Sequence, residues 1–136
     1  MFSQNRDQLR QVFQASWNKY QQQQPLQGVE SLIVSVIQQH PEYQPLLMSP
    51  EALHRDYTQQ TNPFLHMGLH ITLAEQVQMD RPAGIRHVYQ RLLRRSPDQH
   101  QAAHQMLDCL AQILSEAHQA GRQPDEAAYL TQLQKI

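Results

Sequence analysis

Residues 96–121 read SPDQHQAAHQMLDCLAQILSEAHQAG, and this stretch decides the fold class. Ser96 and Gln99 have the spacing of a capping box, which predicts the start of a helix. Apolar residues then recur every three or four positions and form one face, made of Ala103, Leu107, Leu110, Leu114 and Ala117. Gly121 is typical of a helix C-cap. The stretch therefore predicts one long amphipathic helix that ends at Ala120.

Similar signals divide the rest of the chain into helices. Pro25 and Pro41 end two amphipathic segments, and proline next to Ser, Asn or Asp marks further helix starts. We expect helices over about 5–23, 26–39, 50–57, 63–79, 82–95, 99–120 and 125–133, with 41–45 as a connector. Few glycines and scattered β-branched residues disfavour a sheet. The prediction is an all-α fold, a single compact helical bundle of about five to seven helices, with residues 1–136 as one domain.

Composition excludes several classes of protein. The formal net charge is −1, so the whole chain is not an electrostatic nucleic-acid binder. Cys109 is the one cysteine, which excludes an intramolecular disulfide and a multi-cysteine zinc site. No apolar run has the length of a signal peptide core or a membrane span. We therefore expect a cytoplasmic protein that does not contact membranes.

His66 and His70 carry the first chemical signal. They stand at i and i+4 of the predicted helix 63–79, about 40° apart around its axis, so both imidazoles can reach one metal ion. Leu69 and Leu73 share their side of the helix, which predicts that the two histidines point inward. A buried imidazole must find partners in the backbone, a carboxylate, water or a metal ion.

His104 and Asp108 form a second i, i+4 pair, beside the apolar face of helix 99–120. Two such helices packed side by side would bring His66, His70, His104 and Asp108 together, and helical bundles build metal sites in this way. Three imidazoles and a carboxylate suit Zn²⁺ or non-haem iron. The alternative is a non-catalytic interaction or scaffold protein whose core histidines are structural. Glu75 lies about 140° from His70 around the helix and is not expected to join the site.

The other histidines have ordinary interpretations. His40 and His118 lie near helix C-termini, where the helix dipole favours a cation. We expect the side chains of His54, His87 and His100 to lie at the surface, and Cys109 to act as a small buried apolar residue.

Helix 82–95 with its preceding turn contains five arginines, which are Arg81, Arg86, Arg91, Arg94 and Arg95. A basic stripe of this kind can bind an anionic partner, whereas arginines near a helix C-terminus also suit the dipole. The sequence has no nucleophile elbow and no phosphate-binding glycine loop. No catalytic residue is predicted, and an enzyme is not favoured.

Three segments together resemble a known family. They are His40-Pro41-Glu42-Tyr43, the block from Asn62 to Ile85, and the segment from His104 to Leu110. The chain is similar over most of its length to the bacterial family catalogued as domain of unknown function 1841. It departs from the family pattern at Gln44, where the family has His, and at Asp108, where it has Glu. The resemblance implies a small helical protein and supplies no substrate, cofactor or reaction. It also implies that His66, His70 and His104 belong to the family pattern.

Overall fold

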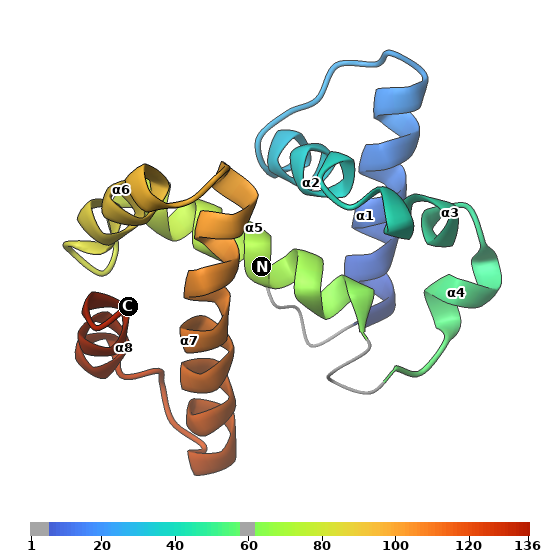
Figure 1. Cartoon of the computed structure of the whole chain (residues 1–136). Coiled ribbons are helices and arrows are strands. Elements are labelled where there is room, and N and C mark those ends of the chain that lie inside the picture. Colours follow the sequence, from blue (N-terminus) through green and yellow to red (C-terminus); the bar gives the residue numbers. More distant parts are fainter. Residues whose placement is uncertain (1–5, 58–61) are drawn as a thin grey trace. The chain divides into compact units, whose positions relative to one another are not determined.

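The computed structural model describes residues 6–57 and 62–136, and within these ranges the regular structure is entirely helical (Figure 1). The all-α prediction is therefore confirmed. The elements in chain order are α1 (Arg6–Gln21), α2 (Val29–Gln38), the 3₁₀ helix η1 (Pro41–Tyr43), α3 (Gln44–Leu47), α4 (Pro50–His54), α5 (Pro63–Met79), α6 (Ile85–Arg95), α7 (Gln99–Ala120) and α8 (Glu126–Gln134).

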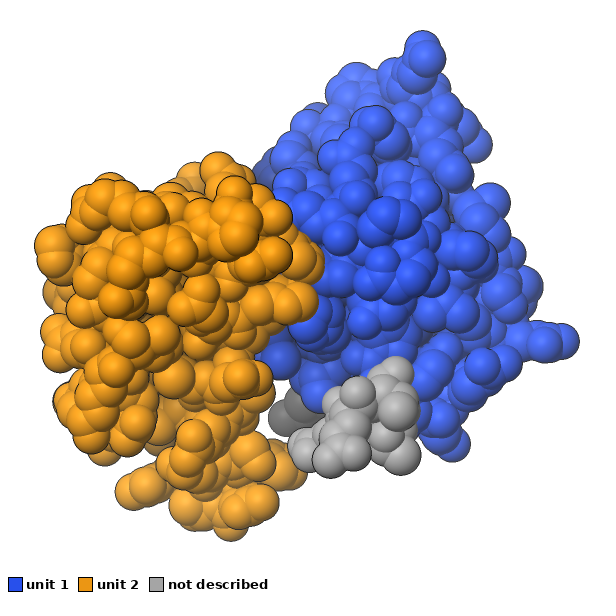
Figure 2. Space-filling view, viewed as in Figure 1, with its two compact units in different colours: residues 1–71 blue, residues 72–136 orange. Residues whose placement is uncertain are grey.

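The chain divides into two compact units, one up to Ile71 and one from Thr72 (Figure 2). The boundary falls inside α5, where no linker interrupts the helix. The position of one unit relative to the other is not determined, and each is described by itself. The expectation that residues 1–136 form one domain stays a prediction.

The first unit has an apolar core between α1, α2 and the first turns of α5. Phe13 of α1, Ile33 and Ile37 of α2, and Met67 and Ile71 of α5 are almost fully buried in one cluster. The short helices α3 and α4 add Leu47 and Leu53 to this cluster. Burial of these side chains anchors the end of α2 and the start of α5, which are the two segments that carry the histidines discussed below.

The second unit packs α6, α7 and α8 against one another. The buried side chains of α6 follow its helical period at Ile85, Val88 and Leu92. Leu110 of α7 and Leu133 of α8 are buried as well. Tyr129 of α8 is buried and donates a hydrogen bond to Oε1 of Gln76 on α5, at 2.8 Å. Burial raises the pKa of this phenol, with the neighbouring Cys109 thiol as a smaller cause, so the phenol remains a donor.

Several helix boundaries differ from the predictions. The expected connector 41–45 contains η1 and the start of α3. The helix expected over 50–57 ends at His54, since Arg55 has extended backbone angles. The predicted start at Asn5 lies outside the described residues.

The N-cap of α7 is Asp98, not Ser96. Its carboxylate accepts a hydrogen bond from the backbone N–H of Gln101, at 2.8 Å. The capping box of Ser96 and Gln99 was therefore a wrong prediction. Gly121 is the C-cap of this helix as predicted, with φ of 64°. Among the helices of residues 6–57 and 62–136, none has the length and apolar character needed to cross a membrane.

Candidate metal centre

His66 and His70 lie on consecutive turns of α5, and their rings come within 4.8 Å of each other, measured between centroids, at an interplanar angle of 83°. His70 is buried and His66 is half-buried, so the predicted inward direction is confirmed for His70. The helical period places them together, as the i, i+4 spacing requires. Leu69 and Leu73 are buried beside them, also as predicted.

His40 completes a group of three imidazoles, and the sequence analysis did not assign it to the site. It follows α2 as the N-cap of η1 and its exposed fraction is 2%. Its ring centroid lies 5.0 Å from that of His66 and 4.8 Å from that of His70, with both contacts edge-on. The three rings thus form a nearly equilateral triangle. The interpretation of His40 as a dipole-facing cation at a helix end is replaced by this burial among imidazoles.

The spacing of the three histidines can hold a metal ion. One ligand nitrogen from each of His40, His66 and His70 lies within 4.8 Å of the others. Tetrahedral Zn²⁺ with bonds of about 2.0–2.1 Å places its ligand nitrogens about 3.3 Å apart. Small rotations of the side chains would close this difference.

A backbone carbonyl determines the tautomer of His40. Its Nδ1 lies 2.7 Å from the carbonyl oxygen of Val36, in the last turn of α2. A carbonyl oxygen only accepts hydrogen bonds, so Nδ1 must donate, and in a neutral imidazole the lone pair is then on Nε2. Metal-binding histidines commonly have this arrangement, in which the second ring nitrogen donates to a carbonyl or carboxylate.

Tyr43 makes two aromatic contacts with the histidine triangle. The ring of Tyr43 is stacked on His40 with centroids 5.2 Å apart and planes only 6° from parallel. Tyr43 also meets His66 edge-on at 6.3 Å. Burial raises the pKa of the Tyr43 phenol, and the charge of Glu42 raises it further. The phenol therefore stays protonated at neutral pH.

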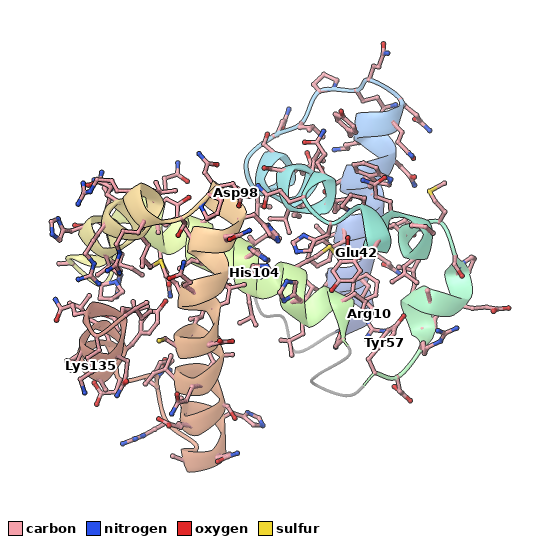
Figure 3. All side chains as sticks on the ribbon, in the orientation of Figure 1. Arg10, Glu42, Tyr57, Asp98, His104 and Lys135 are labelled. Carbon is pink, nitrogen blue, oxygen red and sulfur yellow. The ribbon has the colours of Figure 1, made fainter. Side chains whose placement is uncertain are left out.

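The other two predicted ligands, His104 and Asp108, lie on α7 in the second unit, and both are exposed. Figure 3 shows the position of His104 on this helix. The ring of His104 lies against that of His100, at 4.1 Å between centroids. The prediction that these two side chains join His66 and His70 in one site stays a prediction. Cys109, beside Asp108, is half-buried. Burial raises the pKa of its thiol, with the Asp108 charge as a smaller cause, so a reactive thiolate is disfavoured.

The predicted surface position is confirmed for His54 and His87 but not for His100. The side chains of His54, His87 and His118 are exposed, whereas that of His100 is half-buried.

The arginines of the predicted basic stripe make contacts within the second unit. Arg86 donates to the carbonyls of Val77 and Gln78, and Arg91 and Arg95 both donate to the carbonyl of Ile136. Arg81 lies 3.6 Å from the carboxylate of Glu126 in an exposed ion pair. Arg94 is exposed. These contacts give four of the guanidinium groups structural partners. Binding of an anionic partner to this helix stays a prediction.

Comparisons with known proteins agree with the resemblance in the sequence. No curated protein and no solved structure matches the chain. One family model matches residues 5–135, which is nearly the whole chain. The chain belongs to the family described as domain of unknown function (DUF1841).

Proposed function

We propose that the protein binds a divalent transition-metal ion, Zn²⁺ or Fe²⁺, through a cluster of histidines. The triangle of His40, His66 and His70 carries the proposal. Imidazole is a ligand of intermediate softness that suits Zn²⁺, Fe²⁺, Cu²⁺ and Ni²⁺, whereas Mg²⁺ and Ca²⁺ require oxygen ligands. The hydrogen bond from His40 to Val36 supplies the outer-shell support that such a site needs.

Three imidazoles leave a tetrahedral ion with one further coordination position. His104 is our proposed fourth ligand, with Asp108 as the neighbouring carboxylate, on the strength of their i, i+4 spacing in the sequence. A site with four protein ligands is typical of structural zinc, whereas three ligands and an open position are typical of catalytic zinc. The number of ligands therefore separates a structural role for the metal from a chemical one.

Elemental analysis of the untagged protein after equilibration with Zn²⁺ and, separately, with Fe²⁺ without oxygen tests the proposal. We expect about one equivalent of metal in the wild-type protein. The single variants His66→Ala and His70→Ala should each lower metal affinity by at least about 100-fold, because even loss of an outer-shell partner costs 10–100-fold. His87→Ala, which removes an exposed histidine of α6, is the matched control and should bind like wild type.

The amount of bound metal and the affinities of the α7 variants decide between the alternatives. A wild-type protein that retains no more than trace metal would refute the proposal and favour the alternative of structural core histidines in an interaction or scaffold protein. Loss of metal affinity in His104→Ala or Asp108→Asn would assign these side chains to the site. Unchanged affinity in both variants would leave three protein ligands and remove the fourth from the proposal.

A further inference from the structure

His40 differs from the other two imidazoles in the backbone that carries it. His66 and His70 project from the regular helix α5, where only a few side-chain rotamers are permitted. His40 has backbone angles of −127° and 69°, between α2 and η1, outside any regular helix. Helical geometry therefore does not determine the direction of its ring, and other contacts must do so.

Two of the contacts of the His40 ring restrict different motions. The hydrogen bond from Nδ1 to the carbonyl of Val36 determines the tautomer and one direction within the ring plane. One hydrogen bond still leaves the ring able to swing about its Cβ–Cγ bond, and such a swing weakens that hydrogen bond. The Tyr43 ring, parallel to His40 within 6°, restricts this rotation because a turned imidazole would lose the stacked contact.

We infer that Tyr43 is a positioning residue of the proposed metal centre, whose stacked ring orients His40 so that Nε2 is its ligand nitrogen. This inference rests on the proposed function. Tyr43 acts through its aromatic face, which lies within 6° of parallel to the His40 ring. Tyr43 is the last residue of η1 and His40 is the N-cap of the same element, so the ligand and its support are three residues apart in sequence.

Metal titrations of four variants test the inference, with Zn²⁺ as the probe. Tyr43→Phe keeps the ring and should bind within about 2-fold of wild type, whereas Tyr43→Leu should lower affinity about 10–100-fold, as loss of outer-shell support does. Tyr43→Gln, a polar replacement suited to a half-exposed position, should match Tyr43→Leu. Tyr20→Leu removes an exposed ring stacked on Trp17, and is the control for loss of a tyrosine in the same unit.

A second measurement needs no metal. Long-range ¹H–¹⁵N spectra of the metal-free protein report the protonated nitrogen of each imidazole. We expect His40 to be the Nδ1–H tautomer in wild type and Tyr43→Phe. We expect a mixture of tautomers in Tyr43→Leu, because a ring that swings away from Val36 loses the carbonyl acceptor that holds its proton on Nδ1. A wild-type protein that binds no metal but shows these spectra would refute the proposed function and leave only the orientation of His40 by Tyr43 supported.

The inference itself would be overturned by either of two results. One is wild-type affinity in the folded Tyr43→Leu and Tyr43→Gln variants. The other is a loss of affinity in Tyr43→Phe as large as that in Tyr43→Leu, because the ring would then not be the group that matters.

Discussion

Arg10 is a buried cation whose partners include backbone carbonyls and aromatic faces. Its exposed fraction is 3%, and its Nη1 donates to the carbonyls of Leu53 at 2.9 Å and Arg55 at 2.8 Å. The guanidinium also lies 4.8 Å from the centre of the Phe64 ring and 5.3 Å from that of Tyr57 (Figure 3). A planar guanidinium can donate in its plane while its face meets aromatic rings. Arg10 thereby connects α1 to the end of α4 and the start of α5.

The substitution Arg10→Lys keeps the positive charge but removes the planar group. We expect it to lower the free energy of unfolding by about 2–3 kcal/mol, since an ammonium cannot replace both charged hydrogen bonds and the stacked contacts. Urea unfolding followed by circular dichroism measures the change. Arg94→Lys, at an exposed position of α6, is the control and should stay within about 0.5 kcal/mol of wild type. Equal stability of the two variants would contradict the role given to Arg10.

The histidines show which parts of a site the sequence can predict. His66 and His70 were predicted to lie together because one helix determines their separation. His40 was not predicted to join them, because its distance from His66 and His70 depends on how the end of α2 packs against α5. That packing is determined by tertiary contacts in the core around Ile37 and Met67, which the sequence does not show. A signal was present in His40-Pro41-Glu42-Tyr43, which belongs to the family resemblance. In the structure His40 is buried beside His66 and His70, so this segment contributes an imidazole to the candidate site even with Gln44 in place of histidine.

At the scale of elements, the turn between α5 and α6 contains two reciprocal caps. Asp80 Oδ1 accepts hydrogen bonds from the backbone N–H groups of Gly84 and Arg86, at the start of α6. The Arg86 side chain donates in return to the carbonyls of Val77 and Gln78, near the end of α5. Each helix end thus receives the charge that its dipole favours, with the anion at the N-terminus and the cation at the C-terminus.

This turn predicts a dependence of stability on pH. The backbone hydrogen bond from Arg86 is the largest cause that lowers the pKa of Asp80 from its ordinary value of 3.8. The folded pKa is below the unfolded one, so the stabilisation is complete above about pH 4 and is lost as the pH falls through the folded pKa. Asp80→Asn should lower the melting temperature at pH 7, and the difference from wild type should shrink at pH 3.

Melting curves at pH 7, 5 and 3 measure the difference between Asp80→Asn and wild type. Glu116→Gln, on an exposed part of α7, is the control and should show no such trend. A difference between Asp80→Asn and wild type that stays constant from pH 7 to pH 3 would rule out the role of the ionised carboxylate.

Helix boundaries were harder to predict than helices. Ser96 and Asp98 both prefer the N-cap position, and the sequence alone does not rank them. In the folded chain the Asp98 carboxylate accepts from the Gln101 N–H, while the Ser96 hydroxyl accepts from the side chain of Gln105. Many residues define the apolar period of α7, and Leu107, Leu110 and Ala117 of the predicted face are buried, although Ala103 and Leu114 are only half-buried. The first residue of the helix, in contrast, depends on one competition between two neighbouring caps.

At the scale of the whole molecule, the chain passes from the first unit to the second at a point that the sequence does not mark. α5 continues from Pro63 to Met79 through the boundary after Ile71, with no proline, glycine pair or polar linker there. His66 and His70 precede the boundary, and His104 follows it. Of the proposed ligands, His40, His66 and His70 belong to the first unit and are observed close together. His104 belongs to the second unit, and its place in the site is a prediction. Metal binding therefore tests whether one ion stabilises helices of both units.

Hydrogen exchange with and without Zn²⁺ measures that response. At 100 times its dissociation constant, a ligand that binds only the folded state stabilises it by about 2.7 kcal/mol. We expect slower exchange in the last turn of α2 and in α5, which carry or support His40, His66 and His70. Slower exchange in α7 as well would indicate that His104 is a ligand, and this effect should then vanish in His104→Ala. Mg²⁺ is the control and should leave exchange unchanged, because imidazole is a poor ligand for it. Exchange that Zn²⁺ leaves unaltered in α2 and α5 would contradict a metal bound at the triangle, since no ion can bind there without stabilising the helices that hold its ligands.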